Sequence, residues 1–137
     1  MNQVFVKNSI TADMAQKMID AATAKAQELG VAIVIAVVDE GGNLKTFRRM
    51  DNAMLLSVEG AQRKAYTALM GMPPQVFADI IKGDPVAVAA IQSLPDVMLM
   101  GGGQPIIIDG ALVGAIGVSG GLVDQDIVCA QAGIDVI

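Results

Sequence analysis

Residues 31–50 read VAIVIAVVDEGGNLKTFRRM, and this stretch decides the fold. Residues 31–38 are a continuous apolar run rich in β-branched side chains, which predicts a strand buried on both faces or against other subunits. Residues 39–43 have the composition of a turn, and residues 44–50 read as a returning strand. Because two strand-like runs flank one short turn, the stretch predicts a β-hairpin.

A second hairpin is predicted nearer the C-terminal end. Residues 106–108 and 111–118 are strand-like runs separated by Asp109-Gly110, a pair strongly favoured in tight hairpin turns. Residues 3–6, QVFV, predict a further short strand. We therefore expect a central antiparallel sheet of about five strands. The regular strand–helix–strand repeats of Rossmann and barrel folds are not found in the sequence.

Helices are predicted before, between and after the hairpins, so the expected fold class is α/β of the α+β kind. The first helix is capped by Ser9 or Thr11 and ended by Gly30. Its apolar positions recur at spacings of three and four residues: Met14, Met18, Ala22, Ala26 and Leu29. Residues 73–81 are expected to form a short irregular or helical stretch, residues 86–92 one or two helical turns, and residues 123–136, approximately, a last helix.

The helix expected over about residues 53–70, capped by Asp51 or Asn52, carries two stripes. The predicted core stripe consists of Met54, Val58, Ala61, Ala65 and Leu69. The stripe beside it is small or polar and consists of Ser57, Gly60, Lys64 and Thr67. Two interpretations of the second stripe stay open: it walls a pocket, or it is a solvated edge of the helix.

Length and composition describe a small and unusually apolar protein. The chain has 137 residues, which is enough for one domain, so residues 1–137 are expected to form a single domain. Apolar residues make up 53% and charged residues only 17%, while a chain of this size hides only about two-thirds of its unfolded surface. We expect a homo-oligomer that buries apolar surface between copies; the alternative is a monomer with an alanine-rich surface.

Charge and composition argue against several classes of function. The net charge is −5, the nine basic residues are scattered and the aromatic residues are few, so we expect no nucleic-acid binding. The longest apolar run, residues 31–38, is far too short to span a membrane. The first residues lack the pattern of a secretory signal. We therefore expect a cytoplasmic protein with no membrane partner.

The chain contains no histidine and one cysteine, Cys129. A Ser-His-Asp triad, a histidine-based zinc or iron site and a cysteine-based zinc site are all excluded, and we expect no metal site. Cys129 lies in an apolar helical setting and is interpreted as a small buried hydrophobic residue.

Two glycine-rich segments are candidates for ligand contact. The amides of Gly101, Gly102 and Gly103 can form an anion-binding nest, or the segment is a loop that needs positive φ. Ser119-Gly120-Gly121 precedes a helix whose first turn carries Asp124 and Asp126, which repel a phosphate. A neutral or carboxylate ligand on these amides is the more plausible interpretation.

Charged residues at strand and helix ends form the third candidate set: Asp39, Arg49, Asp51, Lys64 and Asp124. Lys64 is a candidate base or carboxylate anchor, and Arg49 a bidentate carboxylate ligand. Structural pairing of the same residues is equally open. We expect one pocket where the Gly101–Gly103 loop, the Ser119–Gly121 turn and the Lys64 face converge.

A series of motifs in this order resembles one known family: VVDEGGNL (37–44), RMD (49–51), KAYTA (64–68), GGGQP (101–105), GAIGVSGG (114–121), Asp126, and Cys129 with Ala130. The chain is similar over residues 11–134 to the GlcG/HbpS-like group, which includes the C-terminal domain of PduO-type proteins. The resemblance implies a profilin-like fold, with an antiparallel sheet flanked by helices, in a homo-oligomer. It also implies links to haem binding or degradation, and to cobalamin, diol and hydroxy-acid gene contexts.

The resemblance makes haem a candidate cofactor, but otherwise the cofactor is unknown. Haem-binding members are tied to His or Thr ligation, and this chain has no His. Iron is then reached only by Met, Lys, Cys129, Tyr66 or Thr67, so we expect no tight histidine-type haem site.

The predicted ligand-binding set gathers these candidates: Asp39, Arg49, Asp51, Thr67, Gly101, Gly102, Gly103, Pro105, Ser119, Gly120 and Gly121. Three functions stay open. The first is a small-molecule-binding accessory protein for haem, corrinoid or a carboxylated metabolite. The second is a cofactor-free enzyme acting on a small hydroxy or carbonyl acid, with Lys64 and Asp124 as its catalytic acid and base. The third is a ligand-free scaffold subunit.

Overall fold

The computed structural model describes residues 1–137 and contains one antiparallel sheet of four strands, in the order β2-β1-β4-β3. The strands are β1 (Val34–Asp39), β2 (Leu44–Arg49), β3 (Gly103–Ile108) and β4 (Ala111–Ser119). Both predicted hairpins are therefore confirmed, and β1 pairs with β4 to join them.

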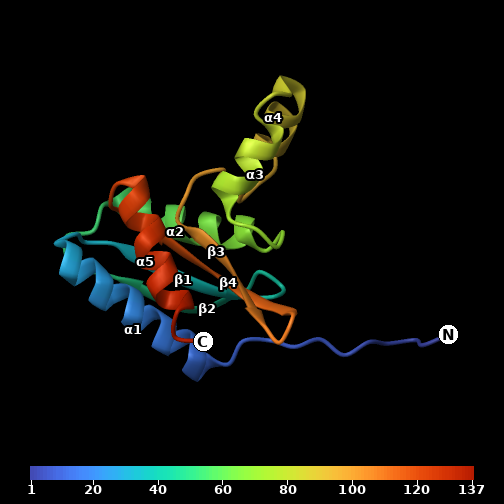
Figure 1. The fold of residues 1–137 in the computed structure, drawn as a ribbon, viewed down its shortest axis with the longest axis horizontal. Helices are drawn as coiled ribbons and strands as arrows, with labels where there is room; N and C mark the ends of the chain where they lie inside the picture. Colours follow the sequence, from blue (N-terminus) through green and yellow to red (C-terminus); the bar gives the residue numbers. More distant parts are fainter.

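The predicted fifth strand is wrong. Residues 1–9 form no strand and extend away from the body of the molecule (Figure 1). Val4, Phe5 and Val6 are exposed. No strand of this chain lies beside residues 3–6, so their backbone groups form no hydrogen bonds of a β-ladder.

Successive side chains of the central strands point to opposite faces of the sheet, so the core has two layers. Ile35 and Val37 of β1 belong to a cluster of 15 buried residues on the face that α1 and α5 cover. Ala36 and Val38, which point to the opposite face, lie in two smaller clusters with alanines of α2. Because β1 is buried on both faces, its sequence is continuously apolar, as predicted.

Helices cover both faces of the sheet (Figure 1). Helices α1 (Ala12–Leu29) and α5 (Val123–Ile134) lie on one face, and α2 (Leu55–Ala68) lies on the other. Thr11 caps α1 by accepting a hydrogen bond from the Met14 N–H at 3.1 Å, and Gly30 ends it with φ 72°. None of the helices is long and apolar enough to cross a bilayer.

Two further helices, α3 (Pro74–Ile81) and α4 (Pro85–Gln92), project from the sheet domain (Figure 1). We call residues 73–96 the arm. In α3 only Pro74 is buried, and α4 has no buried residue. The arm therefore contributes almost nothing to the core of its own chain.

Helix α2 differs from its prediction in two ways. Its N-cap is Met54, without a side-chain cap, rather than Asp51 or Asn52. The stripe of Ser57, Gly60, Lys64 and Thr67, one interpretation of which was a solvated edge, is buried, whereas Met54 from the predicted core stripe is exposed.

The physical reason for the second difference is Gly117 of β4, which has no side chain where α2 crosses the strand. A Cβ atom on Gly117 would collide with the carbonyl oxygen of Ala61 on α2. The helix therefore approaches the strand closely through its small residues, and the face with Gly60 and Ala61 turns inward.

Candidate functional sites

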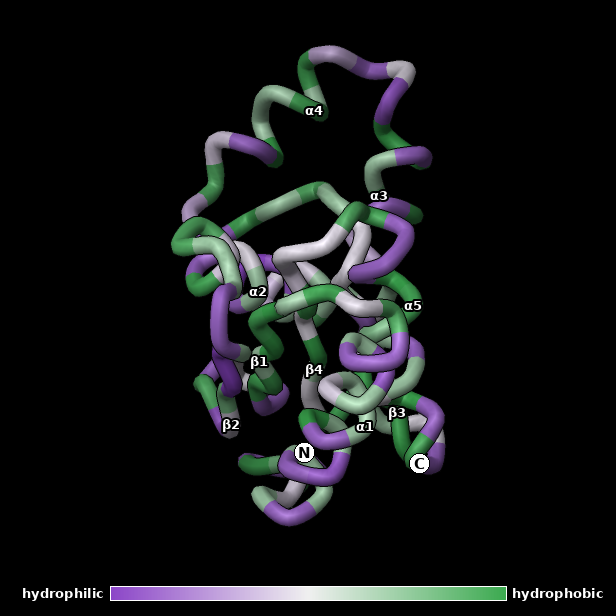
Figure 2. Tube along the Cα trace, turned by 90° about the vertical axis from the view of Figure 1, so that its left-hand side faces the viewer, coloured by the Kyte–Doolittle hydropathy of each residue, from purple (hydrophilic) through white to green (hydrophobic).

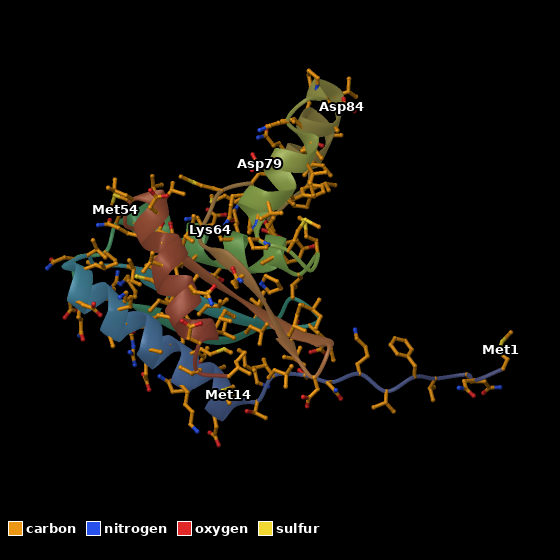
Figure 3. The ribbon with its side chains drawn as sticks, viewed as in Figure 1. Met1, Met14, Met54, Lys64, Asp79 and Asp84 are labelled. Atoms are coloured by element: carbon orange, nitrogen blue, oxygen red, sulfur yellow. The ribbon has the colours of Figure 1, made fainter.

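The most deeply buried charged groups form an ion pair between two helices. Lys64 on α2 and Asp126 on α5 have side chains 1% and 3% exposed, and the Lys64 Nζ lies 3.0 Å from the Asp126 Oδ2. The same ammonium donates a hydrogen bond to the Val118 carbonyl oxygen of β4 at 3.0 Å. Lys64 therefore connects α2, α5 and the end of the sheet; Figure 3 shows its place beneath the arm.

The two glycine segments surround this pair. Gly102 has φ +123°, and a Cβ there would meet the Val118 carbonyl oxygen and lie 3.0 Å from the Lys64 Nζ. The Gly121 N–H donates to the Asp126 Oδ1 at 2.9 Å. The structure thus brings the Gly101–Gly103 loop, the Ser119–Gly121 turn and Lys64 together, and a side chain at Gly102 would displace the ammonium.

The electrostatics of this cluster are dominated by burial. Desolvation raises the pKa of Asp126 above its ordinary value of 3.8, although Lys64 and the hydrogen bond from Gly121 act in the opposite direction. Burial, together with the charge of Asp126, also raises the pKa of the Cys129 thiol to about 11. Cys129 is therefore a neutral thiol at physiological pH rather than a reactive thiolate.

Asp126, rather than Asp124, is the partner of Lys64. Asp124 lies in the same first turn of α5 but is exposed. The sequence contains a signal for this difference, because Asp126, Cys129, Ala130 and Gly133 recur at helical spacing on the buried face of α5. Asp124 lies two residues from Asp126, on another face of the helix.

The Lys64–Asp126 cluster has no cavity beside it. The four cavities of the chain are lined by other residues, and Gly101, Gly102 and Gly103 are buried. Within a single chain, the cluster joins secondary-structure elements and presents no open volume to a ligand.

Two adjacent arginines line a cavity of about 440 Å³ at the end of β2, beside α1. The lining residues are Thr23, Gln27, Arg48, Arg49, Met50 and Asp51. Arg48 is held by Asp20 and Thr23, at 3.0 and 2.9 Å. Arg49 forms no ion pair within the chain, so its guanidinium keeps its donors available.

The only tyrosine lies between two further cavities. Tyr66 is 44% exposed and lines a cavity of about 420 Å³ together with Leu44 and Arg63. It also lines a cavity of about 350 Å³ with Leu69 and Met70. The sequence indicated Tyr66 only as a candidate iron ligand and gives no signal for these cavities, because they depend on how the β1–β2 turn lies against α2.

The other candidate residues are dispersed. The Asp39 carboxylate accepts hydrogen bonds from the N–H groups of Gly41 and Asn43 at 2.9 and 3.0 Å. Its burial would raise its pKa, but these hydrogen bonds outweigh burial and the pKa is lowered. Thr67 accepts a hydrogen bond from the Met98 N–H at 2.9 Å, and Pro105 lies in edge strand β3. Asp39 therefore shapes a turn and Thr67 anchors the return of the arm.

Comparison with known proteins identifies the family. Residues 10–135 match the family model described as haem degrading protein HbpS-like. The chain is 37% identical over 129 residues to an uncharacterised 15.0 kDa protein encoded between dhaT and dhaS in Citrobacter freundii, covering 93% of this chain and 91% of that protein.

Two further relatives carry functional names. The chain is 37% identical over 123 residues to the corrinoid adenosyltransferase PduO of Salmonella typhimurium, covering 85% of this chain but only 35% of PduO. The crystal structure of a PduOC:heme complex aligns with a TM-score of 0.86 at 33% identity, covering 94% of this chain and 95% of the other. The family match and the motif resemblance agree: this chain belongs to the HbpS-like family.

Proposed function

We propose that this protein is a small-molecule-binding accessory protein that holds a small carboxylic acid in the cavity lined by Arg48 and Arg49. The observation that carries the proposal is the free guanidinium of Arg49 in a cavity of about 440 Å³. An arginine fork matches a carboxylate with two parallel hydrogen bonds. Arg48 is fixed beside it by Asp20 and adds positive charge.

The lining of this cavity favours a polar ligand. Met50 is its one apolar lining residue, whereas the Gln27 side chain and the Asp51 carboxylate are polar and form no hydrogen bond within the chain. A hydroxyl group on the ligand can donate to Asp51 while the carboxylate lies on Arg49. The chemistry therefore favours a small hydroxy acid.

The donor set does not fit histidine-ligated haem. The chain has no histidine, the Cys129 thiol is buried and neutral, and the Lys64 ammonium is held by Asp126. The PduOC complex contains haem, but this chain offers no imidazole or thiolate ligand for the iron of such a haem. The same donors argue against tight haem binding in the Arg49 cavity, which offers only Met50 as a soft ligand.

A second candidate function rests on Tyr66. A flat ligand such as a corrin or porphyrin could stack on its exposed ring and place an acidic edge near Arg63. Arg63 is already paired with Glu59 at 2.7 Å, which weakens its attraction for a further anion. For this reason we rank the Tyr66 cavities second.

The enzymatic alternative requires a substrate to reach Lys64. Its side chain is 1% exposed, so proton transfer to a ligand needs an opening of the Gly101–Gly103 loop. Turnover of a hydroxy acid that is abolished by Lys64→Met in folded protein, but is unaffected by Arg49→Gln, would favour this alternative. Absence of any ligand would favour the scaffold function.

Calorimetric titration tests the proposal with lactate as the probe and its neutral amide, lactamide, as the matched ligand. We expect lactate to bind the wild type more tightly than lactamide does. Arg49→Gln should weaken lactate binding by about 10- to 150-fold, the value of a hydrogen bond to a charged group. Lys45→Gln, on the same strand but outside the cavity, is the control and should bind like the wild type. Equal lactate affinity in Arg49→Gln and wild type would refute the proposal.

The proposal also includes self-association, a cytoplasmic location and a profilin-like fold. Self-association is supported by the apolar composition and by the exposed apolar side chains of the arm. A cytoplasmic location is inferred from the composition and the single buried cysteine. A profilin-like assignment of the fold is supported by the antiparallel sheet with helices on both faces.

A further inference from the structure

The cavity of about 350 Å³ beside Tyr66 is lined by a carboxylate whose charge no group of the chain compensates. This cavity lies where the β1–β2 turn meets the end of α2, and Figure 2 shows α2 between the arm and the strands of the sheet. The carboxylate is that of Glu40, whose Oε2 is buried and accepts no hydrogen bond. Glu40 also belongs to none of the ion pairs of the chain. Because a partly buried carboxylate without a partner is costly, this group favours a cation beside it.

The Tyr66 ring forms another wall of the same cavity, and the turn that carries Glu40 holds it in place. Gly42 of that turn has φ +85°, and a Cβ atom there would lie only 3.2 Å from the Tyr66 Cδ2. The backbone of the turn therefore packs directly against the ring. The face of an aromatic ring attracts a cation through its quadrupole, so the turn positions two groups that favour positive charge.

The charges around the ring also favour a cation. No basic side chain lines the cavity of about 350 Å³. In the neighbouring cavity of about 420 Å³, the one basic group, Arg63, is paired with Glu59 at 2.7 Å. Asp96 lines that neighbouring cavity too and forms no ion pair. Acidic groups therefore remain uncompensated on both sides of the Tyr66 ring.

The rest of the lining decides which kind of cation fits. The aliphatic and thioether side chains of the cavity are those of Leu69, Met70 and Val97. The Thr67 hydroxyl is already used, because it donates to the Arg63 carbonyl oxygen at 2.7 Å and accepts from the Met98 N–H at 2.9 Å. A primary ammonium has three N–H donors and would find few acceptors here. A quaternary ammonium has none, and its methyl groups suit an apolar wall.

We propose that this cavity binds a small quaternary ammonium ion, with the positive charge held between the Glu40 carboxylate and the Tyr66 ring. The site shares no lining residue with the Arg49 cavity and takes a ligand of the opposite charge. The inference therefore goes beyond the proposed carboxylate binding, and each of the two sites stands or falls by itself.

NMR titration of the full chain with choline tests the site, because Tyr66 is the only tyrosine and its ring signals are unique. Choline should shift these ring signals with saturation, and its methyl protons should show nuclear Overhauser effects to the ring. Two matched ligands separate charge from methylation. The neutral isostere 3,3-dimethylbutan-1-ol has the same shape without the charge, and ethanolamine has the charge without the methyl groups. Both should bind more weakly than choline.

Variants assign the effect to the two groups, with affinity measured from the line width of the choline methyl signal. Glu40→Gln keeps the size of the side chain and should weaken choline binding at least about fivefold. Tyr66→Leu should weaken it by about 2- to 30-fold, whereas Tyr66→Phe keeps an aromatic face and should lose less. Glu28→Gln is the control, because Glu28 is an exposed acid on α1 that lines no cavity, and it should bind choline like the wild type.

Four results would overturn the inference. They are equal affinities for choline and its neutral isostere, tighter binding of ethanolamine than of choline, wild-type affinity in Glu40→Gln, and choline binding that leaves the Tyr66 ring signals unmoved. Circular dichroism should show that Glu40→Gln stays folded, because Glu40 forms no ion pair within the chain. A loss of affinity in that variant then reports the site rather than the fold.

Discussion

The Lys64 ammonium lies between a carboxylate of α5 and a backbone carbonyl of β4, so the burial of each charge depends on the other. A buried ion pair offsets the cost of removing two charges from water only while both partners are present. If the Lys64–Asp126 cluster stabilises the fold, removing one partner should lower the free energy of unfolding more than removing both.

Lys64→Met should lower the free energy of unfolding by about 3–5 kcal/mol, because it leaves the Asp126 carboxylate buried without a partner. The double variant Lys64→Met/Asp126→Leu should recover most of that loss. Urea denaturation at pH 7 measures both. If the double variant is as unstable as the sum of the two single variants, the pair is not coupled as described.

Acid should partly rescue Lys64→Met. Burial already raises the pKa of Asp126 above 3.8, and removing the ammonium raises it further. For a carboxyl whose folded pKa lies above its unfolded value, the stabilisation is full below the unfolded pKa and is lost as pH rises through the folded pKa. The stability deficit of Lys64→Met against wild type should therefore shrink between pH 7 and pH 4. A deficit that grows on acidification would contradict this.

Gly102 should tolerate no side chain. Gly102→Ala combines a backbone at φ +123° with contacts to the Val118 carbonyl and the Lys64 Nζ. We expect it to lower the free energy of unfolding by about 2–4 kcal/mol. Gly83→Ala is the matched control, because its Cβ meets no atom within 4 Å and its φ is not positive. Chemical denaturation compares them, and equal stabilities would show that the glycine loop can shift.

At the scale of elements, the sequence predicted both hairpins and the three long helices, because their periodicity and turn residues are local signals, and it left α3 open between a helical and an irregular stretch. It misplaced the α2 cap and predicted the wrong exposure for Met54, because the depth of α2 is set by glycines of β4 some 50 residues away. The strand expected at residues 3–6 failed for a related reason: a strand needs a neighbour, and this chain supplies none.

The attachment of the arm to α2 depends on one hydroxyl. Thr67→Val removes the acceptor of the Met98 N–H while keeping the shape of the side chain. The variant should be less stable by about 1–3 kcal/mol, and the Met98 amide should exchange with solvent faster. Hydrogen exchange measures this directly. Thr46→Val in β2, whose hydroxyl forms no hydrogen bond within the chain, should leave Met98 unchanged.

At the scale of the whole molecule, the candidate residues divide between a closed cluster and open cavities. The sequence placed both glycine segments beside Lys64, but expected a pocket where the chain has a filled, buried ion pair. Residue types indicated which groups have the chemistry to bind an anion. They did not indicate which of these groups has free volume beside it, because cavity shape depends on contacts between distant elements.

Haemin should form no tight complex with a defined axial ligand. The chain has no histidine, the Cys129 thiol is buried and neutral, and the Lys64 ammonium is paired with Asp126. The ligands left for haem iron are exposed side chains such as Tyr66. Absorption titration should show broad changes and no sharp low-spin Soret band. A sub-micromolar complex that is lost in Tyr66→Phe would contradict this expectation and favour the Tyr66 cavities.

The most direct test of carboxylate binding is the NMR signal of the arginine Nε–H groups during titration with lactate. If Arg49 holds the carboxylate, its Nε–H signal should shift with saturation. Lactamide should leave it nearly unmoved, and the Arg63 signal should stay constant with either ligand. A lactate titration in which Arg49 does not respond, while Arg63 or the amides of the Gly101–Gly103 loop do, would place the ligand elsewhere and contradict the proposed function.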